Sequence, residues 1–172
     1  MNLIILDADV VIHFLELGIW DKFIENNQVY LAQTVIGEIK YYFPLSDPYK
    51  KNIVNLNEYV EVNKLNSVSI FVSDLNDFNI ECQRRNAPEL DIGEKETLAA
   101  VYLEKVEDSK ICLAETAAIR CAVFVGLGEQ CISAEQALSE CGMSRKLKNQ
   151  FSKKWFQGVK NKAEIDKIQF GN

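Results

Sequence analysis

The chain has 172 residues, of which 48% are hydrophobic and 10% aromatic, enough for a folded core and too much for a disordered chain. Its formal net charge is −6. No apolar run approaches the length of a membrane span, and no basic region precedes an apolar stretch at the N-terminus, so we expect a cytoplasmic protein without membrane contact.

Basic residues are concentrated at the end of the chain. Residues 143–172 hold eight Lys/Arg and two Asp/Glu of the 19 basic and 25 acidic residues, which leaves 11 basic and 23 acidic residues before them. An acidic body with a basic tail favours an anionic partner, although lysine-rich terminal helices also occur as solvated surfaces. We expect one domain over 1–142 and a basic helical extension over 143–172.

Short apolar runs and helical patterns alternate along the first part of the chain. Residues 3–6 are apolar without alternation, which predicts a strand buried on both faces. Residues 10–26 have helical spacing with a break near Gly18, and residues 29–32 predict a second strand. Residues 45–56 are polar and include a Ser-Asp-Pro turn signal.

Further helices and one more strand are expected after residue 33. The apolar run 111–113 predicts the strand. Strands that alternate with helices predict a layered α/β domain with a largely parallel sheet. The expected helices are 34–43 (capped by Thr34), 73–86 (capped by Ser73), 91–106 (beginning at Asp91), 116–123 and 133–142 (capped by Ser133).

The five cysteines do not form a metal-binding pattern. They include no CxxC pair, and His13 is the single histidine of the sequence. A zinc site of the usual Cys/His kind is therefore not expected. We interpret the cysteines as small buried apolar residues of a reducing compartment.

Two acids follow predicted strands directly. Asp7 comes after residues 3–6, and Glu115 stands two residues after 111–113. Ligands of parallel α/β sheets bind beyond the carboxyl ends of the strands, so we expect both acids at one rim. Glu115 also has a simpler interpretation as a cap or solvated residue. Asp7 is the acid least explained by local structure, because Asp9 lies nearer the first helix and is the better cap.

Three more acids are candidates for the same site. Asp91 and Glu94 are three residues apart at a predicted helix start and share its face. The same pattern is also a capping box, which needs no catalytic role. Glu38 lies between Val35 and Tyr42 on the flank of an apolar stripe, although it could equally be a surface acid.

The set of acids carries more weight than any member. Carboxylates gathered at one rim raise each other's pKa unless a cation lies between them. Carboxylate oxygens without Cys or His suit Mg²⁺ or Mn²⁺. Such ions activate water and neutralise charge on a phosphodiester, which would let an acidic body act on a polyanion.

Four segments resemble a known family in their order and spacing. They are IILDADVVIHF at the start, TVIGEIKYY from Thr34, LDIGEKETLAA from Leu90 and ICLAETAAIRCA from Ile111. Over residues 1–141 the chain resembles PIN domains, in particular small prokaryotic ones with an LDxGE motif.

This resemblance implies a three-layer α/β/α fold and a Mg²⁺- or Mn²⁺-dependent ribonuclease that cuts single-stranded RNA. It implies metal ligation by Asp7, Glu38 and Asp91, with Glu94 beside them as a fourth catalytic residue. Many such proteins are dimeric toxins of toxin–antitoxin pairs, so RNA, an antitoxin protein and a second copy of the chain are the expected partners.

One position departs from the family pattern. After the fourth strand the family usually has an aspartate, commonly in a pair, and this chain has Ala114-Glu115. Either Glu115 reaches back to the ion as a metal ligand, or the site has lost one. A catalytically impaired module that binds nucleic acid or protein therefore remains the alternative.

A second alternative explains Asp9 better. The pattern Asp7-x-Asp9 after a strand also resembles the first motif of haloacid-dehalogenase-like phosphatases, with Asp7 as nucleophile and Asp9 as acid/base. The later lysine and acidic pair of that family have no convincing counterpart, because Asp74 and Asp77 come too early. In the favoured interpretation Asp9 caps the first helix or orients water on the metal.

The tail segment SRKLKNQFSKKWF, residues 144–156, mixes lysines with aromatics. Lys153, Lys154 and Trp155 would contact phosphates and stack on bases. An amphipathic helix that packs its aromatics on the body is the competing interpretation.

Overall fold

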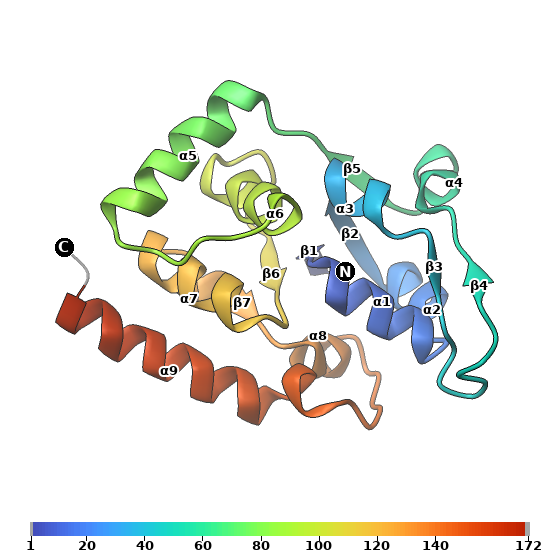
Figure 1. Ribbon diagram of the computed structural model, residues 1–172. Helices are drawn as coiled ribbons and strands as arrows, with labels where there is room; N and C mark the ends of the chain where they lie inside the picture. Colours follow the sequence, from blue (N-terminus) through green and yellow to red (C-terminus); the bar gives the residue numbers. More distant parts are fainter. Residues whose placement is uncertain (1, 171–172) are drawn as a thin grey trace.

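The computed structural model describes residues 2–170, and it has helices on both faces of a central sheet (Figure 1). The helices are α1 (Ala8–Glu16), α2 (Trp20–Asn26), α3 (Gln33–Glu38), α4 (Leu56–Glu61), α5 (Val72–Arg84), α6 (Ile92–Tyr102), α7 (Thr116–Val125), α8 (Ala134–Glu140) and α9 (Lys153–Phe170), with short 3-10 turns η1 (Gly128–Gln130) and η2 (Asn149–Phe151). The strands are β1 (Asn2–Leu6), β2 (Asn27–Ala32), β3 (Tyr41–Tyr42), β4 (Asn52–Ile53), β5 (Asn66–Val68), β6 (Lys110–Cys112) and β7 (Cys131–Ile132).

The main sheet of the described chain is parallel throughout. Its strand order is β5-β2-β1-β6-β7, and each neighbouring pair is parallel. β3 and β4 form a separate antiparallel hairpin. The chain therefore has the three-layer α/β/α architecture that was expected, with a C-terminal helix in addition.

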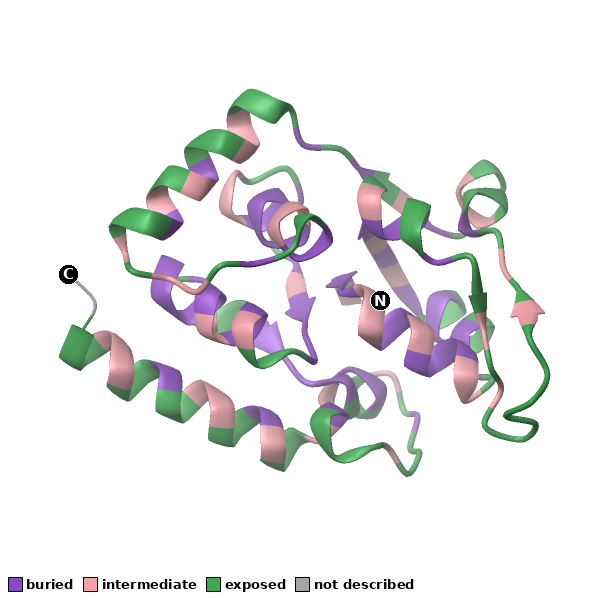
Figure 2. Ribbon diagram, viewed as in Figure 1, coloured by how far each residue is buried: buried purple, intermediate pink, exposed green. Residues whose placement is uncertain are grey.

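Strand β1 lies at the centre of the sheet, which explains its uninterrupted apolar sequence. Ile4 and Leu6 pack into the core on one face with α1, α2 and α8, whereas Ile5 packs into the core on the other face with α5, α6 and α7. All three are fully buried, as Figure 2 shows for the centre of the molecule. A strand covered on both faces has no polar side to alternate with.

Several expected helix boundaries are wrong. The helix from Thr34 to Phe43 is in fact α3, which ends at Glu38, and Thr34 lies inside it rather than at its cap. Ser73 likewise lies inside α5, whose N-cap is Phe71. The other early end is that of α6, which stops at Tyr102 and not near Val106. Tertiary contacts override such local signals.

Other local predictions are confirmed. The break near Gly18 separates α1 from α2, and Gly18 has a φ of +65°, which glycine adopts without strain. Ser133 caps α8 by accepting a hydrogen bond from the Gln136 N–H (3.1 Å). Among the cysteines, all but the half-buried Cys141 are buried.

The C-terminal extension is attached to the body. In Figure 1, α9 runs alongside α7. Phe156 packs into the core on the α7 side, and the ring of Phe151 stacks on His13 of α1 at 4.0 Å between centroids. Within residues 2–170 there is no helix both long and apolar enough to cross a membrane.

Candidate metal centre at the carboxyl edge of the sheet

The chain brings the candidate acids to one edge of the sheet. Asp7 follows β1, and its backbone N–H donates to Cys112 O (3.2 Å) at the end of β6. Glu115 is three residues beyond β6, at the start of α7. Glu38 ends α3, which follows β2 directly. Because α6 leads back to the start of β6, its first turn, with Asp91 and Glu94, lies at this carboxyl edge as well.

Asp7 is the most buried of these acids. It is 3% exposed, and its Oδ2 has no hydrogen-bond partner among the residues that the structure describes. Burial, followed by the neighbouring charges of Asp9, Glu94 and Glu115, raises the pKa of Asp7 to about 8. A buried carboxylate without a partner is costly, so this oxygen calls for a cation or a proton.

The expected helix cap at Asp9 is wrong. Asp7 itself occupies the N-cap position of α1, but its side chain does not bond to the helix amides, and Asp9 lies within the first turn. Burial raises the pKa of Asp9, and the charge of Asp91 raises it in the same direction because the Asp9 carboxyl lies near the acids of α6. Neither aspartate is used as a cap by its side chain, so a local structural role does not explain this pair.

Asp91 and Glu94 do form the capping box. Asp91 Oδ1 accepts from the Glu94 N–H (2.8 Å), and Glu94 Oε2 accepts from the Asp91 N–H (3.1 Å). The box uses one oxygen of each carboxyl and leaves the other. Glu94 is 6% exposed, and its Oε1 has no partner within residues 2–170. Burial, followed by the charges of Asp91, Glu115 and Asp9, raises the pKa of Glu94 to about 7.

Glu38 approaches Asp91 across Gly93. A Cβ on Gly93 would lie 3.4 Å from Glu38 Oε2 and 3.6 Å from Asp91 Oδ1, so both oxygens are close to this one point. The same Cβ would lie 3.3 Å from Val35 Cγ2 of α3. Glu38 is exposed as a residue, but partial burial of its carboxyl and the charge of Asp91 raise its pKa. The missing side chain at Gly93 thus lets α3 and α6 bring their acids together.

Glu115 completes the acidic group from the far side of β1. It is the N-cap residue of α7, but its side chain makes no capping hydrogen bond. Burial raises its pKa, and the charges of Asp9 and Asp91 act in the same direction. Its predecessor Ala114 is buried in the core and supplies no ligand. The Glu115 carboxyl therefore lies close enough to Asp9 and Asp91 for their charges to act on it.

The acidic group consists of six residues, namely Asp7, Asp9, Glu38, Asp91, Glu94 and Glu115. Positive charges compensate their negative charges only slightly. The main charges acting on Asp7, Glu94, Glu38 and Glu115 are all those of other carboxylates. Lys148 acts on Asp9 alone of the six. As the side chains are placed, no three His, Cys, Asp or Glu of residues 2–170 are grouped closely enough to hold a metal ion. The donor atoms are nevertheless of the kind that Mg²⁺ and Mn²⁺ bind, namely carboxylate oxygens of which two are buried and unpartnered.

Two residues of the site were missed by the sequence analysis. Gly93 was part of a motif but had no role until the approach of α3 was visible. Glu96 was not considered, yet its Oε2 accepts from the Thr34 N–H (3.2 Å) and so fastens the first turn of α3, which lacks a side-chain cap, to α6. No local signal in the sequence marks Glu96, because its partner is a backbone N–H on another helix.

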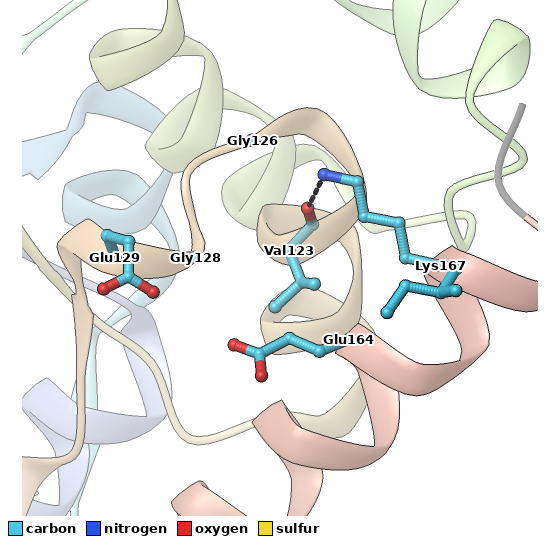
Figure 3. A pocket seen from close by; sticks show the side chains of 7 residues that line it. Val123, Gly126, Gly128, Glu129, Glu164 and Lys167 are labelled. Atoms are coloured by element: carbon cyan, nitrogen blue, oxygen red, sulfur yellow. Dashed lines mark hydrogen bonds between the residues drawn. The ribbon is translucent and has the colours of Figure 1, made fainter.

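The predicted nucleic-acid residues of the tail lie on α9. Lys153 and Lys154 are exposed in its first turn, whereas Trp155 is half-buried against the core. Further along, α9 and the end of α7 enclose a pocket of about 400 Å³. Figure 3 shows Lys167 reaching from α9 to Val123 O (2.8 Å), with Glu164 on the same helix and Glu129 on the other side of the pocket. This pocket shares no residue with the acidic group and lies where the extension packs on the body.

No protein-family model, curated protein or solved structure matches the chain.

Proposed function

We propose that this chain is a Mg²⁺- or Mn²⁺-dependent endoribonuclease of PIN type that hydrolyses single-stranded RNA. The observation that carries the proposal is the pair of buried carboxylate oxygens without partners, Asp7 Oδ2 and Glu94 Oε1, within a group of six acids. A protein gains nothing in stability from such a group, because burial and like charges both oppose ionisation. A divalent cation bound among these carboxylates would offset their mutual repulsion and the cost of their burial.

Each acid has a role in this proposal. Asp7, Glu38 and Asp91 would hold the ion, and Glu115 would supply the ligand that Ala114 lacks. Glu94, with a pKa of about 7, would take a proton from the attacking water through its free Oε1. A bound Mg²⁺ or Mn²⁺ activates water and neutralises charge on the phosphate. Asp9 would orient water beside these groups.

Incubation with a labelled single-stranded RNA tests the proposal. We expect cleavage with Mn²⁺ or Mg²⁺, none with EDTA, and none by Asp7→Asn. Asp108→Asn is the matched control, because Asp108 is an exposed aspartate in the α6–β6 loop at the opposite edge of the sheet. Absence of cleavage and of any metal-induced stabilisation in the wild type would contradict the proposal. The choice of RNA rests on the resemblance to PIN domains.

The second candidate is a catalytically impaired module that binds nucleic acid or protein, and Ala114 favours it. By the resemblance to PIN domains, the buried Ala114 would stand where that family usually has an acid. Retained metal binding with no turnover on any single-stranded RNA would favour this candidate over the enzyme.

The resemblance also extends the proposal to a toxin with an antitoxin partner and a homodimeric state. Induced expression of the wild type would then arrest growth, while Asp7→Asn would not. Equal growth of both strains would contradict the toxin role without affecting the ribonuclease.

A further inference from the structure

The hairpin formed by residues 40–53 begins directly after the acidic group. Its first residue, Lys40, lies two positions beyond Glu38, and β3 pairs with β4 in antiparallel register. Figure 1 shows the hairpin leaving the end of α3 and passing beside α1 and α2. A molecule bound along this hairpin would therefore have one end near Glu38.

The hairpin is held to the body by its backbone. The Leu45 N–H donates to Glu16 O (2.9 Å) at the end of α1, and the Val54 N–H donates to Lys40 O (3.0 Å) across its base. Tyr42 packs against the core, and its hydroxyl accepts from Asn52 Nδ2 (3.3 Å). The hairpin thus presents its outer residues on a fixed support.

Those outer residues include three exposed aromatics. Tyr49 is 96% exposed, Tyr41 47% and Phe43 41%, and the rings of Tyr41 and Phe43 meet edge to face at 5.8 Å. The hairpin appears as an exposed segment in Figure 2. A group of exposed aromatics on one short segment indicates a contact surface, and aromatic rings are platforms on which unpaired bases stack.

Lysines accompany the aromatics. Lys40, Lys50 and Lys51 are exposed, and within residues 2–170 none of them forms an ion pair. Lys51 Nζ lies 3.8 Å from the centroid of the Tyr41 ring, a cation–π contact. Asp47 is the single acid of residues 40–53, whereas the sequence before residue 143 has 23 acids to 11 bases. This local reversal of charge favours an anionic partner over a neutral or basic one. Among anionic partners, the exposed rings of Tyr41, Phe43 and Tyr49 favour a single nucleic-acid strand, whose unpaired bases can stack on them.

We propose that the 40–53 hairpin is the surface that holds a single RNA strand and directs it to the acidic group. Tyr41, Phe43 and Tyr49 stack on bases, and Lys40, Lys50 and Lys51 contact phosphates. The proposal rests on the proposed ribonuclease function for the identity of the strand. It places binding on the hairpin rather than on residues 144–156, because Phe151 and Phe156 are buried in the core and Trp155 is half-buried against it.

Fluorescence anisotropy with a labelled single-stranded RNA of about twelve nucleotides tests this surface. The 172-residue chain with Asp7→Asn is the parent, so that binding is measured without cleavage. Removing one stacked aromatic with Tyr49→Ala should weaken binding about 5- to 100-fold. The Tyr49 side chain is almost fully exposed, so the variant should melt at the parent temperature. The double variant Lys50→Ala/Lys51→Ala should weaken binding and reduce the slope of log K against log salt by about 1.4.

Matched variants on α9 give the controls. Lys162→Ala removes an exposed lysine and Phe170→Ala an exposed aromatic, and both should bind as the parent does. Unchanged affinity in both hairpin variants would overturn the proposal, as would loss of binding only in Lys153→Ala/Lys154→Ala, which would place the strand on the extension. Absence of RNA binding by the parent would overturn it too and would leave a protein partner as the occupant.

The two proposals fail in different ways. If the wild type never cleaves RNA, yet the hairpin variants lose RNA binding, the hairpin proposal stands and the ribonuclease proposal fails. If the wild type cleaves RNA with Mn²⁺, and the hairpin variants bind and cleave normally, the ribonuclease stands and the hairpin proposal fails.

Discussion

The acidic group and the C-terminal extension treat their charges in opposite ways. In the extension, Lys148 pairs with Glu16, Asp166 with Arg120 and Lys160 with Glu129. In the acidic group, the strongest neighbours of each buried carboxyl are further carboxyls. Paired charges fasten one part of a fold to another, whereas gathered like charges oppose folding until a cation or proton joins them. The paired charges of the extension therefore indicate a structural attachment, whereas the gathered carboxyls indicate a functional site.

The largest expected effect is loss of cleavage in Asp7→Asn. Removal of a residue that only supports a metal ligand typically lowers activity or metal affinity roughly 10- to 100-fold, so loss of a ligand should cost at least about a hundredfold. Initial rates on single-stranded RNA at saturating Mn²⁺ measure the effect. Asp108→Asn should keep the wild-type rate. A rate for Asp7→Asn within a few-fold of the wild type would remove Asp7 from the site.

The same substitution should stabilise the metal-free protein at high pH. The pKa of Asp7 is raised from 3.8 to about 8 in the folded state, so its contribution to stability is fully present below pH 3.8 and is lost as the pH rises through about 8. Against this gain, the new amide leaves polar atoms without partners. We expect Asp7→Asn to raise the free energy of unfolding at pH 8 by roughly 2–4 kcal/mol, and by less at pH 5.

Urea unfolding in EDTA at both pH values measures this difference. A gain that is the same at pH 5 and pH 8 would show that the Asp7 carboxyl is not the titrating group.

Addition of metal should make the acidic group stabilise the folded state, which it destabilises when no metal is bound. Mn²⁺ at about a hundred times its dissociation constant should stabilise the wild type by about 2.7 kcal/mol, because it binds the folded state alone. Asp7→Asn should lose this stabilisation, and Glu115→Gln should lose part of it if Glu115 replaces the ligand absent at Ala114. A full metal response in Glu115→Gln would assign Glu115 to the solvated surface.

Gly93→Ala should separate stability from metal binding. An alanine in α6 gains roughly 0.5–1 kcal/mol of helix propensity. Its Cβ would lie 3.3 Å from Val35 Cγ2, which requires a shift of a few tenths of an ångström in α3, and 3.4 Å from Oε2 of Glu38 on the same helix. We expect a melting temperature close to that of the wild type and a several-fold weaker affinity for Mn²⁺. Unchanged affinity would show that the approach of Glu38 to Asp91 does not matter for the ion.

The smallest effect is expected in the extension. Lys148→Met removes a partly exposed pair with Glu16 (2.9 Å), which contributes about 0.2–1 kcal/mol. The stack of Phe151 on His13 remains to hold the segment. Thermal melting should shift slightly, and the rate of RNA cleavage should stay at the wild-type value. A large loss of cleavage would contradict a purely structural role for the extension and would make it part of the functional site.

Sequence patterns were informative where burial decides the residue type. Residues 3–6 are apolar because both faces of β1 are covered, and this is visible in the sequence alone. The strand β5 was not predicted, because its sequence Asn-Ser-Val lies at the sheet edge, where polar residues are tolerated. The end of α3 at Glu38 was missed for another reason, since the chain turns there to pair β3 with β4, and such a pairing leaves no local signal.

The candidate site was predictable as a set of positions and not as a geometry. Asp7 and Glu115 follow strands, and parallel strands end at one edge, so their proximity follows from the sequence pattern. The close approach of Glu38 to Asp91 depends on how α3 packs on α6 over Gly93, which is a tertiary contact. The capping box of Asp91 and Glu94 was recognisable from the sequence. That each carboxyl keeps one oxygen free depends on side-chain conformation, which the sequence does not specify.

A crystal structure of the wild type grown with Mn²⁺, with anomalous differences collected to locate the ion, tests the central claim most directly. The account predicts a peak at the carboxyl edge of the sheet, coordinated by Asp7 and by Asp91 or Glu38, and no such peak in crystals of Asp7→Asn. An edge without Mn²⁺ in well-ordered wild-type crystals, with the six carboxyls turned away from one another, would contradict it.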